Sequence, residues 1–218
     1  TARRRSATFF SMCPWRRAAV TLADWALPGL RWQASAALDR WAQDSHVSVG
    51  VALDARFADD RVSLGLESAS WLPLGSGGRF AQGGVSSAWR STTDVHEPSW
   101  SAVAGVAAAS GAAPLDLWPG AGTGFARAPL LRAHPLLQHG VVVGPVFGRR
   151  LWHGNVEYQH PLRVAPAAAL RLAAFADTAS AWRRVDEQDR RFHSDVGAGV
   201  RVVLPGTGGI VRADVACG

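Results

Sequence analysis

Few residues in this sequence combine the types and the spacing that catalysis or cofactor binding requires. The glycines of 120–124 look like a phosphate-binding loop, but no buried strand leads into a helix there. No Gly-x-Ser-x-Gly motif offers a nucleophile. No two histidines share a predicted helix face, and the two cysteines, Cys13 and Cys217, stand near opposite ends. We therefore predict that the protein is not an enzyme and uses neither a metal nor a cofactor.

The charged residues favour ion pairing over catalysis. Asp177 falls on the polar face of a predicted strand, where an ionised carboxylate must be paired or solvated. Arg132 lies in a long loop and can make a bidentate, charge-assisted contact with it. Alternatively, Asp177 pairs within the wall with Arg201, and Arg132 is a solvated loop residue. Glu157 and Asp195 are expected as further charges on the polar faces, since nothing fixes their spacing as catalytic acids.

Alternation of apolar and polar residues predicts the strands that carry these charges. In 46–57 every second residue is apolar, a period that a half-buried strand produces and a helix does not. The other predicted strands are 30–41, 61–71, 79–91, 99–110, 149–162, 168–179, 193–204 and 209–217. These are about nine strands of ~9–12 residues, the length that a tilted strand needs to cross a bilayer.

The composition favours a membrane barrel over a soluble β-sandwich. Only 18% of the residues are charged, and the 10 tryptophans suit a membrane interface. The polar faces carry isolated charges and amides among Gly, Ser and Ala, as a barrel lumen does, whereas a sandwich would expose Lys, Glu and Thr to water. We predict an all-β fold, an antiparallel up-and-down transmembrane β-barrel, here incomplete.

Two segments lie outside this pattern. Residues 1–29 are poorly defined and could contribute a partial strand, so the barrel segment is predicted as 30–218. Residues 111–148 lack alternation but are rich in leucine, which predicts a long loop that folds back into the barrel. The first residues make a poor signal peptide, and we expect both ends to be cuts in a longer protein.

The basic charge does not indicate a nucleic-acid partner. The formal net charge is +6, but all 23 basic residues are arginines and they are spread along the chain. A nucleic-acid surface would instead gather them in one patch.

Four short stretches resemble signatures of the Omp85 superfamily, the bacterial surface antigen D15-like outer-membrane proteins. Residues 130–135 (LLRAHP) resemble the hydrophobic-Arg-Gly-aromatic motif of that family's sixth extracellular loop, with Ala133 and His134 replacing Gly-aromatic. Residues 175–179 (FADTA) resemble Phe/Gly-x-Asp-x-Gly on its thirteenth strand, with Ala179 replacing the last glycine. Residues 154–162 and 195–201 are similar to two neighbouring strands of the family.

Counting strands agrees with the resemblance. If 168–179 is the thirteenth of sixteen strands, the segment 30–41 becomes the seventh and 209–217 the fifteenth. The long loop then falls between the eleventh and twelfth strands, where the family's sixth loop belongs. The resemblance implies that Arg132 and Asp177 lock the loop to the inner wall, with Phe175, Glu157, Asp195 and Arg201 as supporting lumen residues.

The resemblance also implies a function and partners. Omp85-like barrels insert other barrels into the bacterial outer membrane or translocate polypeptides across it, so the expected partners are outer-membrane lipid, substrate polypeptides or nascent barrel proteins, and POTRA domains upstream in the same chain. One alternative is a passive D15-like barrel that acts as a membrane anchor or channel. A second is a soluble β-sandwich binding module.

Overall fold

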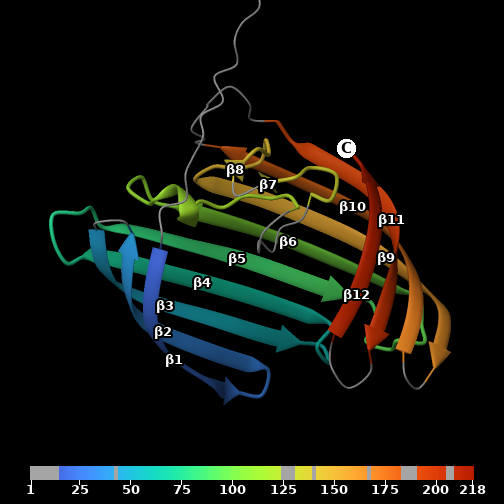
Figure 1. Cartoon of the computed structure of the whole chain (residues 1–218). Helices are drawn as coiled ribbons and strands as arrows, with labels where there is room; N and C mark the ends of the chain where they lie inside the picture. Colours follow the sequence, from blue (N-terminus) through green and yellow to red (C-terminus); the bar gives the residue numbers. More distant parts are fainter. Residues whose placement is uncertain are drawn as a thin grey trace, which may run out of the picture.

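Ten long strands form one antiparallel sheet in a computed structural model of the chain (Figure 1). The structure describes residues 15–41, 44–123, 131–138, 141–165, 168–182, 191–204 and 209–218. The long strands are β1 (Trp15–Leu27), β2 (Leu30–Trp41), β3 (Asp44–Phe57), β4 (Val62–Pro73), β5 (Phe80–Arg90), β6 (Ser99–Ala109), β9 (Arg150–Ala165), β10 (Ala168–Trp182), β11 (His193–Leu204) and β12 (Gly209–Cys217).

The sheet has an up-and-down order and is not closed. Each long strand pairs with the next one along the chain, and β6 pairs with β9 across the long loop. In the described sheet, β1 and β12 form the two edges and are not paired with each other. The prediction of an incomplete, antiparallel up-and-down barrel is therefore confirmed.

The structure has one long strand more than the nine predicted, and this strand is β1. It pairs with β2 over its whole length, from Trp15 opposite Trp41 to Leu27 opposite Leu30. Its outward-facing residues are Ala18, Val20, Leu22 and then Asp24, so the apolar alternation is short and ends in a charge. That break explains why the sequence indicated only a partial strand there. Residues 1–14 of the predicted N-terminal segment lie outside the described residues.

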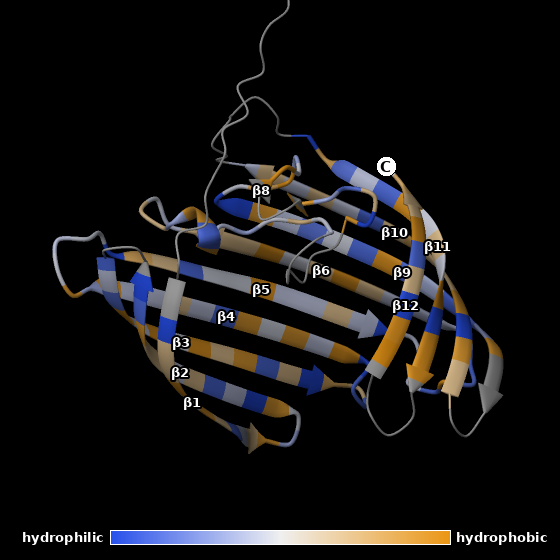
Figure 2. Ribbon diagram, in the orientation of Figure 1, coloured by the Kyte–Doolittle hydropathy of each residue, from blue (hydrophilic) through white to orange (hydrophobic). Residues whose placement is uncertain are grey.

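Alternation divides the sheet into an apolar outer face and a more polar inner face, visible as stripes along the strands in Figure 2. On β3, Val49 and Val51 are half exposed on the outer face, whereas His46 and Ser48, at alternate positions earlier in the strand, are buried on the inner face. On β10 the buried positions Phe175 and Asp177 alternate with the exposed Ala174 and Ala176. The sheet does not pack against a second large sheet, so the predicted alternative of a soluble β-sandwich is not the fold observed.

Two turns at one rim of the sheet are tight. Pro28 and Gly29 join β1 to β2. Gly29 has a φ of 80°, and a Cβ there would lie 2.7 Å from the carbonyl oxygen of Arg56. Ala58, Asp59 and Asp60, which join β3 to β4, all have positive φ. Residues 91–98 connect β5 to β6 at the same rim, and 74–79 and the long loop lie at the other.

The long loop spans 110–149 and packs on the inner face of the sheet. It contains a short 3₁₀ helix, η1 (Leu115–Leu117), and a hairpin of β7 (Leu137–Gln138) and β8 (Val141–Val142). Ala121, Leu131 and Val146 of the loop are buried against Leu151 on β9 and against β10. Residues 124–130 and 139–140 lie outside the described residues. Among the described residues, no helix is long and apolar enough to cross a membrane.

Candidate functional site: the loop arginine on the inner wall

Strand register brings a group of polar side chains together on the inner face of β9, β10 and β11. Asp177 lies opposite Asn155 on β9 and opposite Asp195 on β11. Phe175, two residues earlier on the same face, lies opposite Glu157 on β9. All of these except Asn155 are buried, and Asp177 and Asp195 are almost completely so, at 1% and 0% exposed. Burial makes a partner for each carboxylate necessary.

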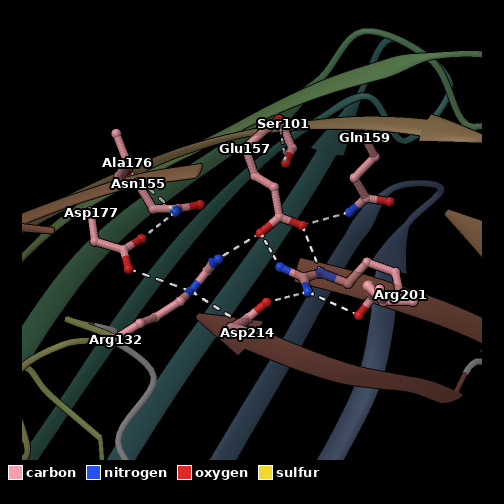
Figure 3. A network of polar contacts seen from close by, with 10 residues as sticks. Ser101, Arg132, Asn155, Glu157, Gln159, Ala176, Asp177, Arg201 and Asp214 are labelled. Atoms are coloured by element: carbon pink, nitrogen blue, oxygen red, sulfur yellow. Dashed lines mark hydrogen bonds and ion pairs between the residues drawn. The ribbon is translucent and has the colours of Figure 1, made fainter. Parts of the chain in front are cut away.

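Arg132 enters this group from the loop (Figure 3). Its Nη2 lies 2.9 Å from Oε2 of Glu157, and its Nε lies 3.4 Å from Oδ2 of Asp177. The guanidinium carbon stands 3.6 Å from the ring centroid of Phe175, a cation–π contact. Only 7% of the Arg132 side chain is exposed, so water screens these contacts weakly.

Arg201 on β11 extends the network to the neighbouring strands. Its Nε and Nη2 donate to the two carboxylate oxygens of Glu157 at 2.9 and 2.8 Å, a bidentate pair. Its Nη1 donates to Asp214 on β12. Glu157 therefore joins the two arginines, as Figure 3 shows. The wall arginine is paired with Glu157 and Asp214, and Asp177 is paired with Arg132 and with Asn155, whose Nδ2 donates to it at 2.5 Å.

Asp195 belongs to a separate contact with the same loop. Its Oδ2 accepts a hydrogen bond from the backbone N–H of Ala133 at 2.6 Å, and its Oδ1 lies 2.6 Å from Nδ1 of His134. His134 also meets His193 of β11 edge to face, with ring centroids 5.4 Å apart. Asp177 and Asp195 thus contact successive parts of one loop turn.

Residues 139–217 match the family model of the Omp85 superfamily domain. Over these residues the chain is Omp85-like. The match is to the superfamily and does not distinguish the surface antigen D15 subtype. Domains of this superfamily occur in outer-membrane proteins that assemble or translocate other polypeptides, which are not enzymatic activities. No curated protein matches the chain.

The matched segment contains the residues of the site that belong to the sheet. Glu157, Asp177, Arg201 and Asp214 lie inside it, and Arg132 lies seven residues before its start. Of the predicted site residues, the structure brings together Arg132, Asp177, Phe175, Glu157 and Arg201, and places Asp195 beside them on Ala133 and His134. That the pair acts as a lock in function stays a prediction.

Sequence reasoning missed three members of the site. Asp214 could have been found, because alternation in β12 points it to the inner face, and register places it opposite Gly199, which has no side chain and leaves room for the Asp214 carboxylate. Asn155 lies opposite Asp177 only once the β9–β10 register is known. His134 stood out in the sequence only as a departure from the loop motif, and its ring contacts the Asp195 carboxylate.

Opposite charges lie close together in this site. Two arginines face three carboxylates, Glu157, Asp177 and Asp214, in a largely buried setting. Removing one member of a buried ion pair leaves an uncompensated charge and typically costs about 3–5 kcal/mol. Among the described residues, no group of three or more His, Cys, Asp or Glu could hold a metal ion. The ion pairs of Arg132 join one point of the loop to β9, β10 and β12.

Proposed function

We propose that the chain forms the wall of an outer-membrane barrel that inserts other barrel proteins into the outer membrane or translocates polypeptides across it. The observation that carries the proposal is the loop arginine, Arg132, seated among Glu157, Asp177 and Asp214 on the inner wall. A loop fixed in this way inside an Omp85-like barrel supports a mechanism of conformation and strand pairing in which no covalent bond changes.

The two faces of the sheet support the proposed setting. The outer face presents exposed valine and leucine side chains, which suits the hydrocarbon of the outer membrane. A hollow on the inner face of β2–β5 is lined mostly by small and polar residues and is bordered by Gln33, Gly50, Glu67 and Gln82. Such a face offers a substrate polypeptide polar contacts with few bulky obstacles.

The sheet edges supply the second part of the proposed mechanism. A strand at an edge has unpaired N–H and C=O groups, and these can pair with a strand of another chain. We propose that a substrate hairpin is guided along the inner wall and adds its strands at a seam of the barrel, while the loop held by Arg132 sets the conformation of the wall. POTRA domains in the same protein would deliver that substrate.

Replacing Arg132 tests this function. Arg132→Ala leaves the Asp177 carboxylate buried without the guanidinium beside it, so we expect the loop to loosen. Assembly or translocation of other proteins should fall at least about tenfold, which corresponds to a loss of about 1.4 kcal/mol. Insertion of the protein's own barrel should persist. The measurements are the amount of folded client barrel in cells and heat-modifiable migration of the variant on a gel.

Arg56→Ala is the matched control. Arg56 pairs with Asp54 on β3 at 2.9 Å, but both side chains are more than 40% exposed, so its loss should change little. Unchanged client assembly in Arg132→Ala would contradict the proposed role of the loop. Normal assembly of all clients in cells lacking the protein would favour a passive anchor or channel instead.

A further inference from the structure

Two aromatic residues of the inner wall, far from Arg132, form a platform under the loop. Trp71 on β4 and Phe80 on β5 stack with ring centroids 5.2 Å apart and an interplanar angle of 21°. Both are buried, at 2% and 6% exposed, although neighbouring positions on the sheet face lipid or lumen. We call this pair the aromatic platform.

Apolar residues of the loop cover the platform. Ala113, Trp118, Leu136 and Phe147 pack with Trp71 and Phe80 in a single hydrophobic cluster. Within the loop, Trp118 stacks on Phe147 at 5.8 Å, and the Trp118 indole N–H donates to the carbonyl of Ala113 at 2.9 Å. Segments at both ends of the loop therefore meet the platform.

A buried carboxylate fixes the orientation of Trp71. Asp39 on β2 is 1% exposed, and its Oδ2 accepts hydrogen bonds from the Trp71 indole N–H at 2.9 Å and from Ser48 Oγ on β3 at 2.5 Å. Arg17 Nε on β1 lies 3.8 Å from Oδ1 of the same carboxylate. A hydrogen bond to an ionised acceptor is stronger than a neutral one and sets the direction of the ring. The chain of contacts runs from β1 to β5 and ends at the loop.

The platform and the Arg132 site lie on different parts of the wall. The platform uses β4 and β5, and the Arg132 site uses β9, β10, β11 and β12. Within the loop the two contacts are close, since Arg132 and Leu136 are four residues apart. Gly122 packs against the loop segment that joins Arg132 to Leu136. Its φ is 146°, and a Cβ there would lie 2.6 Å from the carbonyl oxygen of His134. The loop is thus tightly packed where the two contacts meet.

We propose that the aromatic platform is a second anchor of the loop, separate from the Arg132 network, and that Asp39 is the residue that positions Trp71 in it. The first anchor is ionic and joins the loop to β9–β12. The second is apolar and joins it to β4 and β5. The inference concerns the attachment of the loop and holds whether or not the proposed function is correct.

Hydrogen exchange of loop amides in the detergent-solubilised protein tests the second anchor. Trp71→Ala should speed exchange at least about tenfold at amides near the platform, such as Leu117 and Trp118, which donate to Pro114 and Leu115. The amide of Ala133, held by Asp195, should keep its protection. Arg132→Ala should produce the opposite pattern. Heat-modifiable migration shows that each variant barrel is folded.

Trp89→Phe on the outer face of β5 is the matched control and should leave the whole loop protected, because its side chain is 47% exposed away from the loop. Unchanged loop exchange in a folded Trp71→Ala barrel would overturn the proposal. If Arg132→Ala alone removed the exchange protection of the whole loop, the two anchors would not be separate. If Trp71→Ala does not fold, Asp39→Ala carries the same test.

The role of Asp39 has its own signature in the indole N–H resonance of Trp71, identified by its loss in Trp71→Phe. Asp39→Ala should shift this resonance and speed loop exchange near the platform. Asp39→Asn keeps an oxygen acceptor at the same place and should restore most of the loop protection. If Asp39→Ala changes neither the resonance nor the exchange, Asp39 does not position Trp71.

Discussion

At the scale of single residues, Glu157 is the centre of the inner-wall network. It contacts Arg132 and makes a bidentate pair with Arg201, and Gln159 Nε2 donates to it at 2.8 Å. Asp177, which the sequence singled out, forms an ion pair with Arg132 and accepts a hydrogen bond from Asn155. Alternation predicted that Asp177 lies on the inner face and needs a partner. The central place of Glu157 depends on side-chain positions that only the folded sheet provides.

Neutralising these two carboxylates should therefore have unequal effects. Glu157→Gln removes a carboxylate partner from both Arg132 and Arg201 and should destabilise the barrel by about 3 kcal/mol. Asp177→Asn should destabilise the barrel clearly less. Urea unfolding of the protein in lipid vesicles measures the difference. Equal midpoints for the two variants would show that Glu157 does not hold the network together.

At the scale of elements, alternation located most strands well, because an apolar outer face imposes a strict period of two. The predicted bounds of β2, β11 and β12 match the structure, and β10 continues three residues further, to Trp182, because it stays paired with β9 as far as Arg150. The path of the long loop was not predictable in detail, since it depends on contacts with Trp71 and Phe80, which are distant in sequence. The infolding itself was indicated by the loop's leucines.

Close packing between β10, β11 and β12 gives a prediction at this scale. A Cβ at Gly197 would meet the carbonyl oxygen of Val215 and lie 2.5 Å from Cζ of Phe175, the ring under Arg132. Gly197→Ala should thus destabilise the barrel by about 1–3 kcal/mol and loosen the loop turn at Arg132. The measurements are the temperature of the heat-modifiable gel transition and hydrogen exchange at Ala133.

Gly75→Ala is the control for that substitution. A Cβ at Gly75 meets no atom within 4 Å, so the same chemical change should leave the gel transition in place. A similar loss of stability in both variants would mean that crowding against Phe175 is not the cause.

At the scale of the whole molecule, the two faces of the sheet require different surroundings. Val51 on β3 is 50% exposed on the outer face, while its neighbour Ala52 borders the inner hollow that also contains Glu67. An arginine at position 51 would enter lipid, and one at position 52 would enter a polar space near a carboxylate.

We therefore expect Val51→Arg to reduce membrane insertion, because a lipid-facing arginine near the bilayer midplane costs about 2–4 kcal/mol. Ala52→Arg should insert nearly as well as the unchanged protein. The amount of each variant in the membrane fraction, in its heat-modifiable form, measures this. Equal insertion of the two variants would contradict the assignment of the outer face to lipid.

The unequal rims of the sheet have a consequence for what a cell displays. Tight turns at Gly29 and at 58–61 and the 91–98 connection occupy one rim, and the 110–149 loop and the 74–79 connection occupy the other. Barrels of the outer membrane keep their short turns on the periplasmic side. An antibody or a phage approaching from outside would then meet the long-loop rim, where Leu131, Leu136 and Val146 of the loop are buried against the wall. The proposed anchors would thus keep these apolar side chains off the cell surface.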